Sequence, residues 1–243
     1  MSASTLARPL AARVHALPEL AAWHGETTEP VHEGVLHAAF KALDDGQTHY
    51  TDRPGIKPLR TKAVTQLGMR YGVEYTADEV TITCGATEAR FVALKQLVDA
   101  GKKILHAGDD ETILGAAALI GAALTTDPDD ADIALLYLTN TIPAEQAQAL
   151  AERAGERGWW ILFDTATPDH NNRFHPALSA ELAPLTITIG SASDQLPGWR
   201  VGWLAGSKVA NKLRAYKQSM TICTPSVSQW AAMGLEETVN GAG

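Results

Sequence analysis

The feature that most constrains the fold of this chain is an alternation of short β-rich runs and helical segments that begins near residue 79. Such alternation predicts strands joined by crossover helices, and therefore a mostly parallel sheet with helices on both faces. We expect a three-layer α/β/α architecture. The predicted strands are residues 79–84, 103–106, 132–138, 159–163, 185–189 and 201–204. The helices predicted between and after them are residues 85–97, an alanine-rich stretch within 113–124, 143–156 and 208–218.

Two further helices are predicted before this alternation. Residues 31–43 carry apolar side chains at the period of an amphipathic helix and end in Asp-Asp-Gly, a typical helix stop. Their apolar positions are Val31, Val35, Leu36, Ala39, Phe40 and Leu43. A second helix is expected over residues 57–71. We therefore predict an N-terminal helical arm over residues 1–45 and a single α/β domain over residues 46–243.

The composition argues against several classes of protein. Apolar residues make up 45% of the chain, enough for a sizeable core, and the formal net charge of −8 argues against a general nucleic-acid binder. The longest apolar run, residues 113–124, is too short to span a bilayer, and the N-terminus lacks the apolar region of a secretory signal. The two cysteines and the His170–His175 spacing match no common metal motif. We expect a cytoplasmic protein with no membrane partner, nucleic-acid partner or metal.

Small and polar residues follow the predicted strands at the edge where a ligand would bind. In open α/β sheets, ligands lie outside the carboxyl ends of the strands. Gly85-Ala86-Thr87 opens a helix, where unpaired N–H groups and the helix dipole favour an anion. Ser191 ends another strand, and Arg200 follows a turn with a guanidinium suited to phosphate oxygens. Each feature alone is more typical of a capped helix, a turn or a surface charge.

Taken in order, these motifs are far more specific. THYTDRPGI, TCGATEA, an aspartate that closes a strand, GSxS and LPGWRVGW resemble the class I/II aminotransferases of fold type I, which use pyridoxal phosphate (PLP). The segment KQSMTICTPSVSQWAA also resembles the stretch that follows the arginine-bearing motif in that family. The resemblance covers roughly residues 30–235. It implies the aminotransferase large-domain fold and a homodimer with active sites at its two-fold interface.

The resemblance also implies roles for single residues. Ala86, Thr87, Ser191 and Arg200 match the positions that bind the cofactor phosphate in the family. Tyr50 matches the tyrosine that reaches the phosphate of the neighbouring subunit. Asp164 matches the aspartate that pairs with the pyridine nitrogen and makes the ring an electron sink.

The chain departs from the family at the Schiff-base lysine. With the serines of the motif aligned, Asp194 occupies that position, and with Leu-Pro-Gly aligned, Ala192 occupies it. The nearest lysines, Lys208 and Lys212, lie on a later helix, and we expect the basic residues of that helix, Arg214 and Lys217 included, to be solvated.

Other family positions are also altered. Asn140 is only a loose counterpart of the asparagine that binds the phenolic oxygen of the cofactor, and Thr167 replaces a tyrosine that contacts the same oxygen. The loop that normally supplies a ring-stacking aromatic is reduced to Ala-Gly-Asp-Asp. The sequence ends at Gly243, and we expect the protein to lack the family's C-terminal small domain.

Transamination requires a lysine as imine partner and as proton carrier. We therefore expect no catalytic residue in that position and no ordinary transaminase activity. We expect such a protein to bind PLP noncovalently, another phosphate-bearing ligand, or a protein partner such as a catalytic paralogue. The cofactor is in this view dispensable and can be absent. Two other interpretations stay open. In the first, Ala86, Thr87, Ser191 and Arg200 are relics kept for structural reasons. In the second, the chain is a divergent PLP-dependent aminotransferase that acts on an amino acid and takes its catalytic base from elsewhere in the protein.

Overall fold

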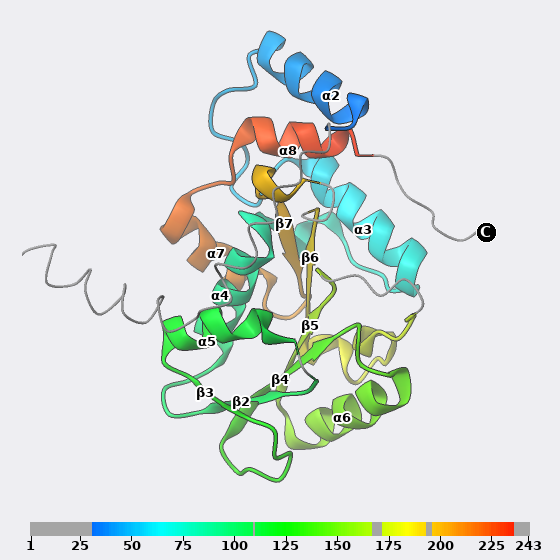
Figure 1. Ribbon diagram of the computed structural model, residues 1–243, viewed down its shortest axis with the longest axis vertical. Coiled ribbons are helices and arrows are strands. Elements are labelled where there is room, and N and C mark those ends of the chain that lie inside the picture. Colours follow the sequence, from blue (N-terminus) through cyan, green and yellow to red (C-terminus); the bar gives the residue numbers. More distant parts are fainter. Residues whose placement is uncertain (1–30, 109, 167–171, 193–195, 236–243) are drawn as a thin grey trace, which may run out of the picture.

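The computed structural model describes residues 31–108, 110–166, 172–192 and 196–235. A seven-stranded sheet with the order β1-β7-β6-β5-β4-β2-β3 runs through the middle of this part (Figure 1). Its strands are β1 (Val80–Thr83), β2 (Lys103–His106), β3 (Ala123–Thr125), β4 (Ile133–Thr139), β5 (Trp160–Asp164), β6 (Thr186–Ser191) and β7 (Gly202–Ala205). Only β7 runs antiparallel to its neighbours, β1 and β6. The predicted mostly parallel sheet is confirmed.

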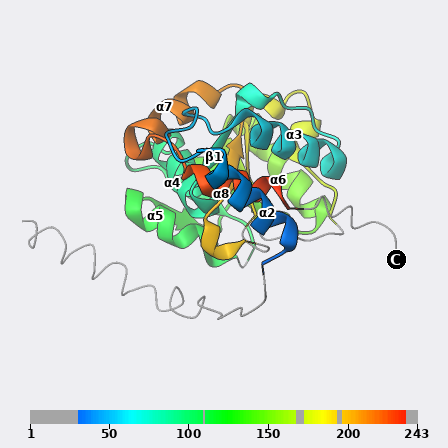
Figure 2. The same cartoon turned by 90° about the horizontal axis from the view of Figure 1, so that it is seen from above.

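Helices cover both faces of the sheet, as predicted (Figure 2). One face carries α4 (Gly85–Leu97), α5 (Leu114–Ile120) and α7 (Ala210–Thr221), and the other carries α3 (Lys57–Tyr71) and α6 (Ala144–Arg157). Each side has its own buried apolar cluster, so the core consists of two layers separated by the sheet. The helices α2 (Glu33–Asp44) and α8 (Ser226–Met233) pack against each other at the β1–β7 end of the molecule.

The strand alternation determines which side chains face α4. Successive residues of a strand point to opposite faces of the sheet. On β5, Ile161 and Phe163 join the cluster under α3 and α6, whereas Leu162 joins the cluster under α4. Asp164 has the same parity as Leu162, and Tyr137 on β4 also faces α4. The register therefore places a carboxylate and a phenol on the same face, beneath α4.

The helix predicted over residues 31–43 is present as α2, but its apolar stripe is only partly buried. Val35, Ala39 and Ala42 lie in the core against α8. Leu36, Phe40 and Leu43, which were expected on the same apolar face, are 40%, 65% and 48% exposed. The reason is geometric, because the six apolar positions span too wide an arc of the helix for a single neighbouring helix to cover.

Two regular elements were not predicted. The alanine-rich helix α5 ends at Ile120, and the following residues form the short edge strand β3 rather than more helix. The helix α8 was not predicted at all. Most of the predicted arm over residues 1–45 lies outside the described residues, so the domain boundaries stay a prediction. No helix in the described ranges has the length and apolar character that a membrane span requires.

Candidate functional site

The candidate site lies at the carboxyl edge of the parallel strands. Because β7 runs in the opposite direction, its first residue reaches the same edge at which β1 and β6 end. The register pairs Gly202 with Thr83 on one side and with Ser191 on the other. The chain turns directly from β1 into α4, so the first turn of α4 also lies at this edge. Ala86 and Thr87 of α4, Ser191 of β6, and Arg200, two residues before β7, are thereby placed at the same edge.

Two glycines allow the close approach of α4 and the segment around Arg200. Gly85 has φ +73°, and a Cβ atom on it would lie 2.4 Å from Nη2 of Arg200. A Cβ atom on Gly202 would lie 2.5 Å from the carbonyl carbon of Gly85 and 2.8 Å from the nitrogen of Ala86. A side chain at either position would therefore push Arg200 or β7 away from the helix start. The guanidinium of Arg200 packs directly on the first residue of α4.

We call Ala86, Thr87, Ser191 and Arg200 the phosphate cradle, and its residues differ in their exposure. Thr87 is exposed on the first turn of α4, whereas the methyl group of Ala86 is buried and only its backbone can serve a ligand. The hydroxyl of Ser191 donates to the carbonyl of Val201 at 3.2 Å. Glu88 is the one acid in this first turn, and its carboxylate accepts from the backbone nitrogen of Cys84 at 2.6 Å. Helix N–H groups, a hydroxyl and a guanidinium thus converge at this end of the sheet.

Tyr50 does not meet the cradle within the same chain. It lies in the loop between α2 and α3, its side chain is 80% exposed, and it lines a surface hollow of about 410 Å³. The hollow is bordered by this loop, the first turn of α3, and Ser226 and Trp230 of α8. Ala86, Thr87, Ser191 and Arg200 do not line it. The resemblance to the aminotransferases implies that Tyr50 would act at the phosphate site of a second copy of the chain.

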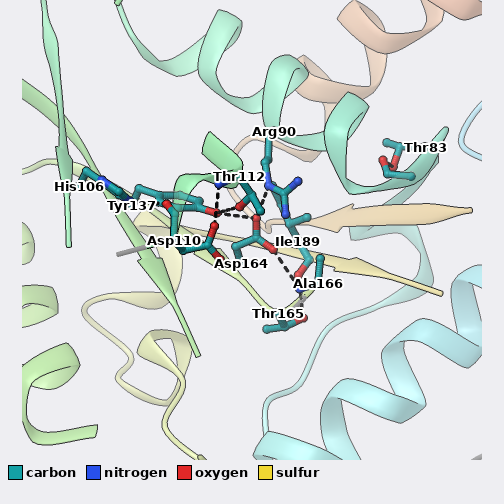
Figure 3. Close-up of polar contacts among 11 residues, drawn as sticks. Thr83, Arg90, His106, Asp110, Thr112, Tyr137, Asp164, Thr165, Ala166 and Ile189 are labelled. Atoms are coloured by element: carbon teal, nitrogen blue, oxygen red, sulfur yellow. Dashed lines mark hydrogen bonds and ion pairs between the residues drawn. The ribbon is translucent and has the colours of Figure 1, made fainter. Parts of the chain in front are cut away.

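Asp164 ends β5 at the predicted position, but its carboxylate accepts three hydrogen bonds from within the protein (Figure 3). Its Oδ2 accepts from Nε of Arg90 at 2.5 Å and from the hydroxyl of Tyr137 at 2.9 Å. Its Oδ1 accepts from the backbone nitrogen of Ala166 at 2.9 Å. The Asp164 side chain is 2% exposed and the Arg90 side chain is 7% exposed. The two form a buried ion pair between β5 and α4.

A chain of hydrogen bonds extends this pair toward β2. Tyr137 donates its proton to Asp164, so the hydroxyl of Thr112, 2.9 Å away, must donate to Tyr137. Thr112 is held in turn by Asp110, whose side chain accepts from its backbone nitrogen at 2.7 Å. Burial raises the pKa of Tyr137 well above its usual value, and the neighbouring Asp164 carboxylate raises it further. Tyr137 is therefore a neutral hydrogen-bond donor at all ordinary pH values.

The PLP of the family fits one end of this site and not the other. The phosphate end fits, because Arg200, Thr87 and Ser191 surround the glycine-opened start of α4. The ring end does not fit, because the Asp164 carboxylate already faces a permanent cation. Asn140 is completely buried, and its Nδ2 donates to the hydroxyl of Tyr71 at 3.4 Å.

Lysines are absent from the strand ends around Asp164. The sequence contains no lysine between Lys103 and Lys208. Nζ of Lys208 lies 5.7 Å from the ring centroid of Trp160, the first residue of β5. Asp164 is the last residue of this strand, four steps or about 13 Å further along. Lys208 is therefore at the opposite edge of the sheet. Ala192 packs its methyl group against the core, and Asp194 and Thr167 lie outside the described residues.

The expectation of a solvated basic face on α7 is wrong for one residue. Lys217 is completely buried, and its Nζ donates to the hydroxyl of Thr224 at 3.3 Å. Burial lowers the pKa of Lys217, and the charge of the nearby Glu88 partly opposes this effect. Lys217 is thus a buried amine close to the start of α4, on the side of Cys84 and Glu88 rather than beside Asp164.

Arg90, Tyr137 and Lys217 were not identified as site residues from the sequence. A signal for Arg90 existed, because it interrupts an otherwise apolar helix face formed by Ala86, Ala93, Leu94 and Leu97. A charge on a buried helix face requires a partner. The identity of that partner depends on which strand the face covers. Among the described residues, no group of three or more histidine, cysteine or acidic side chains is arranged to hold a metal ion.

Comparison with known proteins places the chain among aminotransferases, although no family model matches it. It is 29% identical over 238 residues to a probable N-acetyl-LL-diaminopimelate aminotransferase of Bacillus subtilis, which covers 85% of this chain and 60% of that protein. It is 28% identical over 253 residues to an aspartate aminotransferase of Thermotoga maritima, with 89% and 66% covered. The chain thus spans less than two thirds of the length of these curated relatives.

Solved structures with a similar fold are also aminotransferases. The structure of N-succinyldiaminopimelate aminotransferase from Mycobacterium tuberculosis matches with a TM-score of 0.77 at 26% identity, covering 86% of this chain and 63% of that one. A Thermus thermophilus aspartate aminotransferase mutant matches with a TM-score of 0.78 over 96% of this chain and 69% of that one, at 21% identity, which shows the shared fold alone. Over most of its sequence the chain is therefore homologous to aminotransferases, and its fold is that of the PLP-dependent class I/II aminotransferases of fold type I.

Proposed function

We propose that this chain is an aminotransferase-family protein without transaminase activity, which binds a phosphate-bearing ligand noncovalently at the start of α4. The observation that carries the proposal is the lack of an amine near Asp164. The sequence has no lysine from residue 104 to residue 207, and the two lysines that flank this interval are engaged elsewhere. Lys103 pairs with Asp130 at 2.6 Å, and Lys208 lies over Trp160 at the far edge of the sheet. An aspartate or alanine in the lysine position cannot form an imine.

The proposed ligand site consists of Arg200, Ser191, Thr87 and the backbone of Ala86. Its support is the convergence of these groups on one helix start, where Gly85 and Gly202 permit the approach of the guanidinium. A guanidinium and helix N–H groups bind phosphate by charge-assisted hydrogen bonds, each contributing about 1.5–3 kcal/mol. PLP would be held here by its phosphate, and other phosphate esters would be held in the same way.

Titration calorimetry with inorganic phosphate and with PLP tests this proposal. Removing the guanidinium in Arg200→Gln should weaken phosphate binding about tenfold or more, because one charge-assisted hydrogen bond contributes at least that much. Arg157→Gln is the matched control, since Arg157 is an exposed arginine at the end of α6. Absence of phosphate binding, or equal binding by Arg200→Gln and wild type, would contradict the proposal and leave the cradle as a structural relic.

We further propose that the protein is a homodimer in which Tyr50 contacts the cradle of the second subunit. The support is the 80% exposure of this aromatic side chain and its place in a surface hollow that the cradle residues do not line. Light scattering on the purified protein should give twice the mass of the 25.9 kDa chain. In the dimer, Tyr50→Phe should weaken phosphate binding. A monomer whose phosphate affinity is unchanged by Tyr50→Phe would contradict this assignment.

One observation favours the alternative that the chain is a divergent PLP-dependent aminotransferase. Lys217 is a buried amine whose pKa is lowered by burial, and it lies near the first turn of α4. A lysine with a lowered pKa is a better nucleophile toward an aldehyde than a solvated one. Its amine contacts Thr224, and the charges that act on its pKa are those of Glu88, Cys84 and Cys223 rather than Asp164, which supports the noncatalytic assignment. Covalent trapping of PLP on a lysine would support the divergent aminotransferase, and its absence would support the noncatalytic protein.

A further inference from the structure

The Asp164 carboxylate already has its counter-ion within the fold. Nε of Arg90 lies 2.5 Å from its Oδ2, with both side chains almost completely buried. The guanidinium approaches from α4, while Asp164 points upward from β5, as the close-up shows (Figure 3). A family cofactor would depend on this same carboxylate for its ring nitrogen. The Arg90 guanidinium and a protonated pyridine nitrogen would therefore compete for the single Asp164 carboxylate.

Arg90 keeps its positive charge at all ordinary pH values. Burial alone would lower the pKa of Arg90, but the adjacent Asp164 carboxylate and the Tyr137 hydroxyl outweigh it and raise the pKa above its usual value. The rest of this helix face is apolar, with Ala86, Ala93 and Leu94 buried around the guanidinium. Arg90 can therefore neither lose its proton nor be solvated in place.

The acceptor capacity of Asp164 is also largely used. A carboxylate has about four lone-pair positions, and Asp164 uses three of them for Arg90, Tyr137 and the backbone nitrogen of Ala166. A pyridinium nitrogen would be a fourth donor and a second positive charge against one negative charge. In a buried site, the resulting unpaired cation is strongly unfavourable.

We propose that Arg90 is an internal counter-ion that withdraws Asp164 from ligand binding, so that the site selects its ligand by the phosphate group and does not recognise a pyridinium ring. The part of this inference that concerns ligands rests on the proposed phosphate binding. The part that concerns the ion pair stands on the fold alone. Arg90 is in this sense a specificity-determining residue.

The ligand test compares PLP with its 1-deaza analogue, in which a C–H group replaces the ring nitrogen. The two share the phosphate and the ring shape, so the ratio of their dissociation constants isolates the contact of the nitrogen. In the wild-type protein we expect the ratio to lie within about twofold of unity. Preference of the wild type for PLP by about tenfold or more would show that Asp164 serves the ring nitrogen, and would overturn the proposal.

Removing the internal cation should create the preference that the wild type lacks. In Arg90→Leu, the Asp164 carboxylate loses its counter-ion, and a protonated ring nitrogen can replace it. We expect this variant to favour PLP over the deaza analogue about tenfold or more. Arg60→Leu is the matched control, because Arg60 is equally buried but belongs to α3 and contacts Gly55 and Asp78. Equal affinities for the two ligands in Arg90→Leu would contradict the proposal.

A double-mutant cycle tests the ion pair without any ligand. Urea unfolding is measured for wild type, Arg90→Leu, Asp164→Asn and the double variant. Each single change leaves one buried group without its partner. We therefore expect the decrease in urea midpoint of the double variant to be smaller than the sum of the decreases in the two single variants. Additive losses would refute the pair. If phosphate fails to bind but the cycle is non-additive, only the proposed ligand binding fails.

Discussion

Nε of Arg90 lies 2.5 Å from Oδ2 of Asp164, across 74 residues of sequence. The contact follows from two periodicities. The strand alternation turns Asp164 and Tyr137 toward α4, and the helical period turns Arg90 toward the sheet together with Ala86, Ala93 and Leu97. The carboxylate that would tune a cofactor ring thus becomes part of the core that joins α4 to β5.

Asp164→Asn should destabilise the fold strongly. The substitution leaves the guanidinium of Arg90 buried without a counter-ion, and breaking a buried pair in this way costs about 3–5 kcal/mol. Denaturant unfolding gives the free energy directly. Asp129→Asn is the control, because the Asp129 side chain is 76% exposed and its pair with Arg153 should contribute at most about 1 kcal/mol. Equal losses in the two variants would argue against a buried pair.

Gly202→Ala tests the close contact that shapes the phosphate cradle. The added methyl group would lie 2.5 Å from the carbonyl carbon of Gly85, so β7 or the first turn of α4 must move. We expect a loss of about 1–3 kcal/mol in stability, typical of overpacking, together with weaker phosphate binding. Gly198→Ala is the matched control, because in the described part of the chain no atom beyond the adjoining residues lies within 4 Å of its added methyl. A Gly202→Ala protein with wild-type stability and wild-type phosphate affinity would show that this contact is not needed.

His175 predicts a specific sensitivity to acid. The ring is 1% exposed, its Nδ1 accepts from the backbone nitrogen of Ala177, and its Nε2 lies 3.0 Å from the hydroxyl of Thr188. Burial lowers the pKa of His175 to about 3. The unfolded chain, with a histidine pKa of about 6.5, binds the proton more readily. The free energy of unfolding therefore keeps its full value above about pH 6.5 and decreases as the pH falls toward 3, by about 5 kcal/mol in total.

The measurement is the unfolding free energy of wild type and His175→Asn between about pH 7 and pH 4. The variant should be less stable at neutral pH, but its stability should fall less steeply with acid because the titrating ring is gone. His49→Asn, at an exposed position, should keep the wild-type slope. A His175→Asn slope identical to that of wild type would mean that this ring is not the acid-sensitive group.

Much of the fold could be predicted from the sequence where local chemistry marks both ends of an element. The helix α3 has a proline in its first turn and Gly72 after its end, and it was predicted with the observed bounds. The edge strand β3 has three residues and little burial, so no alternation could reveal it. The helix α8 follows Pro225 and has only eight residues, too few for a clear helical period.

The candidate site was harder to predict, for a different reason. Residues at strand ends can be recognised one by one, and Ser191, Arg200 and the start of α4 do converge at the sheet edge. The partners of buried charges depend on contacts between elements far apart in the sequence. Neither the pairing of Arg90 with Asp164 nor the burial of Lys217 on α7 is visible in any local pattern.

The most direct test of the lysine-free site is reduction of the protein with borohydride in the presence of PLP, followed by peptide mapping. An imine between the cofactor and a lysine would be reduced to a stable adduct on one peptide. We predict only low, scattered labelling of exposed lysines, unchanged in Lys217→Met. A stoichiometric adduct on one lysine, and its loss on substitution of that residue, would show that the chain does tether an aldehyde cofactor and would contradict the account.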